Sequence, residues 1–189
     1  MNSPDAAVLS LLKYRLHAVA IGHLALGYSR SWTRVPKIQI LFDDKQVIEG
    51  RATAFTNGAI ESAIIHCRAL LEFLGLGGSG QSRLRELKSR KPDDSGIEQF
   101  QRLGRLTVQN AVRSYPGSAA EAEAALAYVI YLANKGLAHT TSSFTKQDHG
   151  SKLVDIAFRG VPILLINSFY LPLKLTPPRY QLPGRRRAV

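Results

Sequence analysis

The segment SYPGSAAEAEAALAYVIYLANKGLAH (residues 114–139) predicts a helix more clearly than any other part of the chain. Pro116 and Gly117 break the preceding chain, and Ser118 can cap the first helical turn. Glu121, three residues later, completes a capping box and places a negative charge at the positive end of the helix dipole. The apolar side chains that follow recur at helical spacing along one stripe: Leu126, Ile130, Ala133 and Leu137. The segment is therefore expected to be a core helix.

Three further segments repeat this helical periodicity, and together they predict an all-α fold. These segments are residues 6–27, about 45–75 and 151–171. A short additional helix is expected after Asp94 or Ser95, either of which can cap it. We therefore expect an antiparallel bundle of four to five helices in a single domain of residues 1–173. Residues 174–189 form a basic, proline-rich tail that is expected to be disordered.

Two connections between these helices contain patterns that are typical of a β-strand and of a phosphate-binding loop. Residues 36–45 alternate apolar and polar side chains as a strand does, but a lone strand has no partner, so we expect an extended connection. The glycine-rich residues 75–82 lack the Gly-Lys-Ser/Thr ending of a phosphate-binding loop, and no buried strand precedes them. We interpret them as a helix stop and the start of a mobile, basic connection over about 75–95.

The formal net charge of the chain is +11, and much of the positive charge is concentrated in that connection. Its cations are Arg83, Arg85, Lys88, Arg90 and Lys91. Such a patch attracts polyanions by releasing their counterions, without reading a base sequence. We expect a nucleic-acid-binding surface here, and the alternative is a solvated surface that binds nothing.

Composition and spacing exclude several other kinds of chemistry. The one cysteine, Cys67, rules out an internal disulfide and a cysteine-based zinc cluster, and it fits a reducing, cytoplasmic setting. The sequence has neither the Glu-x-x-His pairs of a di-metal bundle nor a Gly-x-Ser-x-Gly nucleophile elbow, so we expect no metal and no cofactor. Residues 161–173, the most apolar late stretch, are shorter than a bilayer crossing and contain two prolines, so we expect no membrane segment.

The predicted second helix contains a polar cluster within ESAIIHCRALLEFL (residues 61–74). Glu61, Arg68 and Glu72 share one helix face, and Arg68 and Glu72 form an i,i+4 pair. Arg68 lies among apolar residues, so its guanidinium needs carboxylate partners if it is partly buried. The cluster is either a structural ion pair or an arginine that carboxylates orient for phosphate binding.

The end of the predicted third helix, LANKGLAHTTSSF, places further polar residues close together. Lys135 and His139 share a face if the helix continues through Gly136. If Gly136 instead ends the helix in a left-handed conformation, His139 can turn toward Asn134. The hydroxyl of Thr140 can donate to an anion or cap a turn.

These two stretches resemble the HEPN superfamily, a group of helical bundles whose active members carry Arg-x(4–6)-His near the end of the third helix. Asn134 and His139 match the two motif positions with four residues between them, and Lys135 matches the polar position after the first. The resemblance covers about residues 45–171 in architecture, and it extends to a motif only in the two quoted stretches.

The resemblance implies metal-independent RNA cleavage at the interface of a homodimer. His139 would take the proton of the 2′-OH, and Asn134 and Lys135 would hold the phosphate as charge develops. Supporting contacts would come from Arg68, Glu61, Glu72 and Thr140. Asn134 carries no charge, however, and it stands where active members of the family have arginine. One hypothesis is thus a ribonuclease of a defence or toxin system, and the alternative is a non-catalytic helical module that binds nucleic acid or a protein partner through its basic surface.

Overall fold

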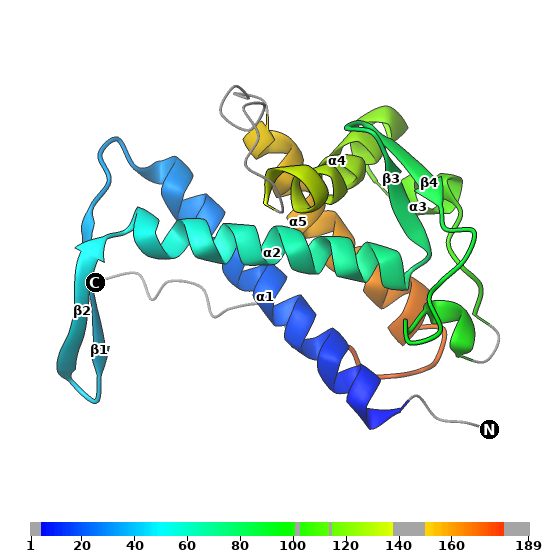
Figure 1. The fold of residues 1–189 in the computed structure, drawn as a ribbon, viewed down its shortest axis with the longest axis horizontal. Coiled ribbons are helices and arrows are strands. Elements are labelled where there is room, and N and C mark those ends of the chain that lie inside the picture. Colours follow the sequence, from blue (N-terminus) through cyan, green and yellow to red (C-terminus); the bar gives the residue numbers. More distant parts are fainter. Residues whose placement is uncertain (1–4, 101–102, 114, 138–149, 180–189) are drawn as a thin grey trace.

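Helices make up most of the structure, a computed structural model that describes residues 5–100, 103–113, 115–137 and 150–179. The α-helices in these ranges are α1 (Ala6–Ser31), α2 (Thr53–Phe73), α3 (Val108–Arg113), α4 (Ala119–Tyr131) and α5 (Gly150–Leu165). A π-helical turn extends α4 and another extends α5, at Leu132–Gly136 and Ile166–Tyr170 respectively. The long helices α1 and α2 lie side by side, and α5 packs against α1, α2 and α4 (Figure 1).

A side-chain cap fixes the start of α4. The hydroxyl of Ser118 accepts a hydrogen bond from the backbone N–H of Glu121 at 3.1 Å, which confirms the predicted cap. The carboxylate of Glu121 accepts hydrogen bonds from the Tyr115 hydroxyl at 2.7 Å and from the Lys152 ammonium at 2.6 Å. Ser118 therefore sets where α4 begins, while Glu121 links this helix end to α5.

Small residues allow α1 and α2 to approach closely where the two helices cross (Figure 1). A Cβ atom at Gly22 would lie 2.9 Å from the carbonyl oxygen of Ala59 and would overlap the methyl group of Ala63. Glycine is needed at this position because the backbone of α2 occupies the space that any side chain would take. The apolar inner face of α1 is buried against the other helices: Leu12, Leu16, Val19 and Leu26.

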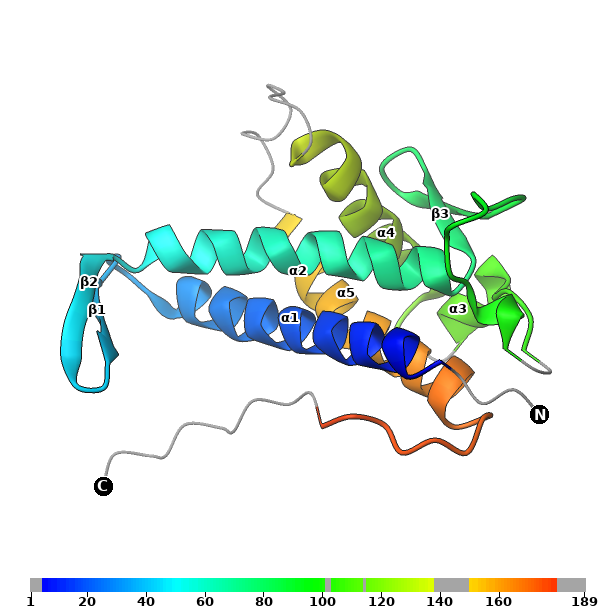
Figure 2. The ribbon, with the colours of Figure 1, turned by 60° about the horizontal axis from the view of Figure 1, so that its bottom comes forward.

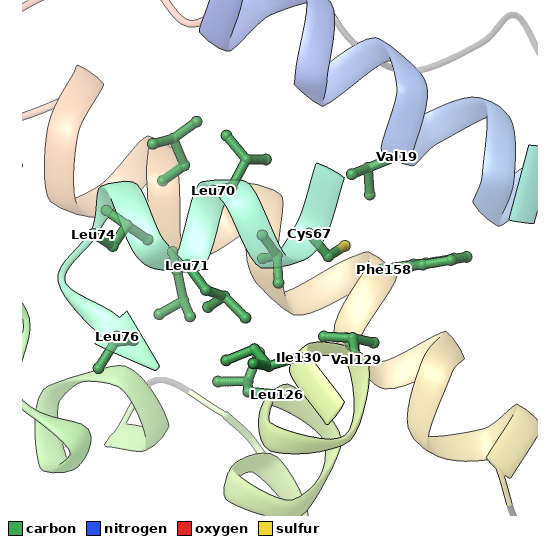
Figure 3. Packing of buried hydrophobic residues seen from close by; sticks show 14 of the residues in the cluster. Val19, Cys67, Leu70, Leu71, Leu74, Leu76, Leu126, Val129, Ile130 and Phe158 are labelled. Carbon is green, nitrogen blue, oxygen red and sulfur yellow. The ribbon is translucent and has the colours of Figure 1, made fainter. Parts of the chain in front are cut away.

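The hydrophobic core lies between α2, α4 and α5, as Figure 3 shows. Leu70 and Leu71 of α2, Val129 of α4 and Phe158 of α5 are no more than 2% exposed. Members of the apolar stripe that the sequence predicts for α4 also lie in this core: Leu126, Ile130 and Ala133. The predicted stripe is therefore buried, but α4 is buried on all sides from Ala125 to Ile130, which one stripe does not predict.

The segment Gly150–Tyr170, which joins α5 to its π-helical turn, is long and apolar enough to cross a membrane by length and composition alone. It has a mean hydropathy of 1.4, and 56% of its most apolar window is buried inside the protein. The core helix of a soluble protein meets the same criteria, so one such helix in the described ranges is weak evidence for a membrane span.

The prediction of an all-α fold is wrong, because two antiparallel hairpins accompany the helices. The first pairs β1 (Lys37–Phe42) with β2 (Lys45–Arg51). The partner of β1 thus follows directly after it, in residues whose apolar spacing also suits a helix. Asp43 and Asp44 close the hairpin with φ angles of 47° and 63°, a conformation that aspartate tolerates in two-residue turns. As a consequence α2 begins at Thr53, well after residue 45.

The second hairpin occupies the connection that the sequence suggests is mobile. It consists of β3 (Leu76–Ser79) and β4 (Arg83–Glu86), and both strands pack on α4 (Figure 1). Gly75, with a φ of 94°, ends α2, which confirms the predicted helix stop. Leu76 and Leu84 are buried in the core. The prediction missed this hairpin because its glycines resemble a flexible linker, whereas two leucines anchor the strands.

A 3₁₀ turn replaces the short helix expected after Asp94 or Ser95. The turn spans Ile97–Gln99, and the next helix, α3, starts only at Val108. Ile97 is buried and Phe100 packs against the core, so apolar side chains still anchor this segment.

The beginning of the predicted tail runs beside α1 (Figure 2). Nε2 of His17, on α1, lies 2.7 Å from the carbonyl oxygen of Arg179 and can donate a hydrogen bond to it. Residues 180–189, the rest of the tail, lie outside the described residues.

Candidate functional site

A cleft of about 620 Å³ opens between the first half of α1, the end of α2 and the segment 87–95 that follows the second hairpin. Its cationic lining consists of Arg15, Arg68, Arg90 and Lys91. Its acidic lining consists of Glu72, Asp93 and Asp94. Apolar side chains complete the lining: Val8, Leu11, Leu12, Phe73 and Leu87. The cleft therefore combines the polar face of α2 with part of the basic connection, two features that the sequence shows only separately.

The pair Arg68 and Glu72 has the geometry that its spacing predicts. Nε of Arg68 donates to Oε1 of Glu72 at 2.9 Å, and each side chain is 39% exposed. Glu61, two turns earlier on α2, is exposed, and the ion pair that Arg68 makes in the described chain is with Glu72. The pair orients the guanidinium but leaves it open to solvent, so both proposed roles of Arg68 are compatible with this geometry.

Arg15 is the residue of the cleft that sequence reasoning missed. Its Nη1 lies 3.1 Å from Nδ1 of His66, which is 51 positions away in the sequence. A guanidinium can only donate, so Nδ1 accepts and the neutral imidazole carries its proton on Nε2. The pKa of His66 is lowered, first by burial and then by the positive charge of Arg15. The ring also makes an edge contact with Tyr14, with centroids 5.2 Å apart.

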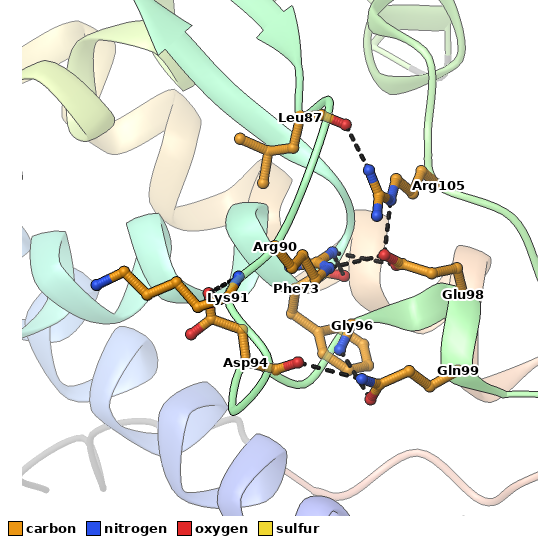
Figure 4. Close-up of polar contacts among 9 residues, drawn as sticks. All are labelled: Phe73, Leu87, Arg90, Lys91, Asp94, Gly96, Glu98, Gln99 and Arg105. Carbon is orange, nitrogen blue, oxygen red and sulfur yellow. Dashed lines mark hydrogen bonds and ion pairs between the residues drawn. The ribbon is translucent and has the colours of Figure 1, made fainter.

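A partly buried ionic network holds the outer wall of the cleft in place (Figure 4). Arg90 donates to both carboxylate oxygens of Glu98, at 2.8 and 3.2 Å, and to the carbonyl oxygen of Phe73 at 2.9 Å. Arg105 donates to Glu98 at 2.6 Å and to the carbonyl oxygen of Leu87 at 2.6 Å. The Arg90 side chain is only 9% exposed. Arg90 therefore links the segment 87–95 to the end of α2 by a hydrogen bond, and its guanidinium is largely shielded from solvent.

The carboxyl group of Glu98 is strongly perturbed by these two arginines. Burial by itself raises its pKa, but hydrogen bonds from Arg90, from its own backbone N–H and from Arg105 have the larger combined effect. The result is a pKa of about 2. Glu98 is consequently ionised throughout the physiological range, as the centre of an arginine–carboxylate–arginine network must be.

The other cations of the predicted nucleic-acid surface lie on the outside of the molecule. Arg83 is 74% exposed and pairs with Glu123 at 3.2 Å, and Nε of Arg85 donates to the carbonyl oxygen of Gly78 at 3.1 Å. Lys88 and Lys91 are exposed. These side chains form an exposed basic row that leads along the hairpin and ends at the rim of the cleft.

Two of the predicted catalytic residues, Asn134 and Lys135, lie in a different part of the molecule. Asn134 and Lys135 are exposed on the π-helical turn that ends α4, and neither lines the cleft. Gly136 is the last residue of that turn and not a left-handed terminator, because the positive φ angles of described glycines fall elsewhere. His139 and Thr140 belong to residues 138–149, which lie outside the described chain. The structure thus joins Arg68 to the basic connection and not to Asn134.

Among the described residues, no three His, Cys, Asp or Glu side chains gather into a group that could hold a metal ion. Comparison of the chain with protein-family models, curated proteins and solved structures found no match. The geometry and charge of the cleft are therefore the basis for a functional proposal.

Proposed function

We propose that the protein binds RNA in the cleft, with Arg68, Arg15 and Lys91 as phosphate ligands. The exposed basic row, which begins with Arg83 and Arg85 on β4, would guide the RNA to the cleft. The observation that carries this proposal is that Arg68 and Lys91, from distant parts of the sequence, line the same open cleft. A planar guanidinium donates two parallel hydrogen bonds to a phosphate, and a lysine adds a point charge. The formal net charge of +11 adds a long-range attraction for any polyanion.

The acidic residues of the cleft favour RNA over DNA and restrict how a strand can lie. Glu72, Asp93 and Asp94 repel phosphate groups, so the sugar or base edge of a nucleotide must face them. A carboxylate accepts a hydrogen bond from the 2′-OH, which is the group that distinguishes RNA from DNA. The apolar lining, including Leu11 and Leu12, offers a surface for an unstacked base. This arrangement suits a single-stranded segment.

Replacing Arg68 by alanine is expected to weaken the binding of single-stranded RNA about tenfold or more, because a charge-assisted hydrogen bond contributes about 1.5–3 kcal/mol. The slope of log affinity against log salt should also fall by about 0.7 for each lost phosphate contact. Fluorescence anisotropy with a labelled oligoribonucleotide at several salt concentrations measures both quantities. The DNA strand of the same sequence should bind more weakly.

The matched control is Arg159→Ala, which removes another exposed arginine from an i,i+4 ion pair. Arg159 pairs with Asp155 at 2.7 Å on α5 and does not line the cleft. Equal loss of affinity in the Arg68 and Arg159 variants would contradict a specific role for the cleft. Binding of RNA that is insensitive to salt would contradict phosphate recognition altogether.

We propose metal-independent RNA cleavage as a second candidate function, on the strength of the resemblance to HEPN proteins and of the exposed end of α4. Asn134 and Lys135 stand on a π-helical turn, a distortion that is frequent at functional sites. In this proposal, His139 takes the proton of a 2′-OH, whose oxygen attacks the adjacent phosphorus. The bond to the 5′ oxygen breaks as that oxygen takes a proton from water, and the products are a 2′,3′-cyclic phosphate and a free 5′-hydroxyl. His139 then releases the proton that it took to solvent.

Incubation of RNA with the wild-type protein and a metal chelator should produce fragments with these ends, and His139→Ala should abolish them. Lys135→Ala should reduce the rate, because it removes the cation nearest to the motif position of Asn134. The RNA affinity of the Lys135 variant should stay unchanged, since Lys135 does not line the cleft. Cleavage at the same rate by the wild type and by His139→Ala would refute this function without affecting the binding proposal.

A further inference from the structure

The hairpin of β1 and β2 projects from one end of the helical body, as an arm beyond the end of α1 and the start of α2 (Figures 1 and 2). Most of its apolar side chains are exposed: Leu41 is 52% exposed, Phe42 66%, Val47 43% and Ile48 43%, while Ile38 and Ile40 are partly buried. Few of its residues touch α2, and its strands pair only with each other in the described chain. The arm therefore offers apolar surface that the helices of its own chain leave uncovered.

A two-stranded hairpin with exposed apolar side chains is a weak structure by itself. An isolated pair of strands is marginally stable in water, and three or more strands with a covered face are needed for independent stability. Each outer edge also carries backbone N–H and C=O groups that no strand of the described chain satisfies. Another strand added to one edge of the arm would satisfy the backbone groups of that edge and enlarge the sheet beyond two strands.

We propose that this strand is β1 of a second copy of the chain, paired antiparallel about a two-fold axis at Ile40. In this register Ile40 faces its own mate and Ile38 faces Phe42 of the second copy, all on one face of the sheet because strand side chains alternate. Each Lys37 then comes near the turn that Asp43 and Asp44 of the second copy form, so both ends of the pair bring opposite charges together. The edge of β1 is thus complementary to itself in both apolar character and charge, and the product is a four-stranded sheet.

The edge of β2 is the poorer candidate for self-pairing. Ile40 pairs with Ile48 and Leu41 with Gln46, so Val47 is an unpaired bulge residue that interrupts the ladder. Pairing centred on Ile48 would also place Lys45 opposite Arg51 of the second copy, and like charges directly opposite each other are destabilising. The β1 edge has neither defect.

A cysteine at the two-fold axis tests the register directly. Facing residues of an antiparallel pair have Cα atoms about 4.5–5.5 Å apart, within the range that a disulfide spans. Under mild oxidation, Ile40→Cys should therefore give a covalent dimer on a non-reducing gel. The native Cys67 is fully buried and should give none. The matched control is Ile65→Cys, at an isoleucine of α2 that is 48% exposed and outside the arm, and it should stay monomeric on the same gel.

Sedimentation equilibrium tests whether the native arm drives association. The wild type should be a dimer, Ile40→Lys should be a monomer at the same concentration, and Ile65→Lys should remain a dimer. Lys37→Glu should weaken the dimer by opposing two acids, and adding Asp43→Asn should restore part of the affinity. Unchanged far-ultraviolet circular dichroism would show that the helical body stays folded in each variant. A wild type that remains monomeric, or a dimer that survives Ile40→Lys, would overturn the proposal.

Discussion

Replacing Glu98 by alanine is expected to lower the free energy of unfolding at neutral pH by about 3 kcal/mol, the low end of the cost of breaking a buried ion pair, because Glu98 itself is 25% exposed. The Arg90 guanidinium is 9% exposed and would lose the carboxylate that accepts two of its hydrogen bonds. Arg105 would lose its partner as well. Chemical denaturation of the two proteins, followed by circular dichroism, measures the difference. Glu49→Ala is the control, because its pair with Lys37 is exposed and is expected to contribute at most about 1 kcal/mol.

The effect of this substitution should depend on pH in a defined direction. The pKa of Glu98 falls from an ordinary value of 4.5 to about 2 in the folded protein, so its ionised form stabilises the fold. This contribution is fully present above pH 4.5 and is lost as the pH falls through about 2. The stability difference between wild type and Glu98→Ala should therefore shrink over that acidic window. A difference that is constant down to pH 2 would show that the charge of Glu98 is not what stabilises the wall of the cleft.

Replacing Phe169 by alanine is expected to cost about 3–5 kcal/mol, the range found when a buried phenylalanine is truncated and leaves a cavity. The Phe169 side chain is completely buried. Its ring makes edge contacts with Phe73, Phe100 and Tyr170, at centroid distances of 5.2, 5.1 and 5.3 Å. These contacts connect the end of α5 to the end of α2, beneath the wall that Arg90 holds.

The control for this substitution is Leu171→Ala, two residues further along. Leu171 is 55% exposed, so its truncation should change the free energy of unfolding by no more than about 0.5 kcal/mol. Both values come from urea denaturation at equal protein concentration. Similar losses in the two variants would contradict the packing described for the aromatic cluster.

The four long helices α1, α2, α4 and α5 were predictable from sequence because their signals are local, whereas the short α3 was not. Ser118 caps α4 as its position suggests, and Leu126 and Ile130 lie in the core because helical spacing places them on one face. The strands were missed because their signals are ambiguous. Val47 and Ile48 suit a helical stripe as well as a strand, and only the left-handed turn before them distinguishes the two. A preference for Asp-Asp in such turns is too weak to outweigh that pattern.

In the cleft, too, contacts between residues close in sequence could be predicted and contacts between distant residues could not. Arg68 and Glu72 are one helical turn apart, so their pairing follows from spacing alone. The contact between Arg15 and His66 joins residues on two helices, so no local sequence pattern predicts it. Arg90 belongs to a run of cations that is typical of a solvated surface, yet its side chain is largely buried in an ion pair with Glu98. Charge patterning predicts where cations are concentrated, whereas burial is decided by partners that folding brings close.

Photo-crosslinking of a single-stranded oligoribonucleotide that carries 4-thiouridine tests most directly whether RNA occupies the cleft. Mass spectrometry of the digested complex identifies the peptides that the RNA touches. We predict crosslinks within residues 8–15, 68–73 and 87–95, the three segments that line the cleft, and we predict that Arg68→Ala reduces them. Crosslinks confined to other parts of the chain, at the same intensity in wild type and Arg68→Ala, would contradict the proposal that the cleft binds RNA.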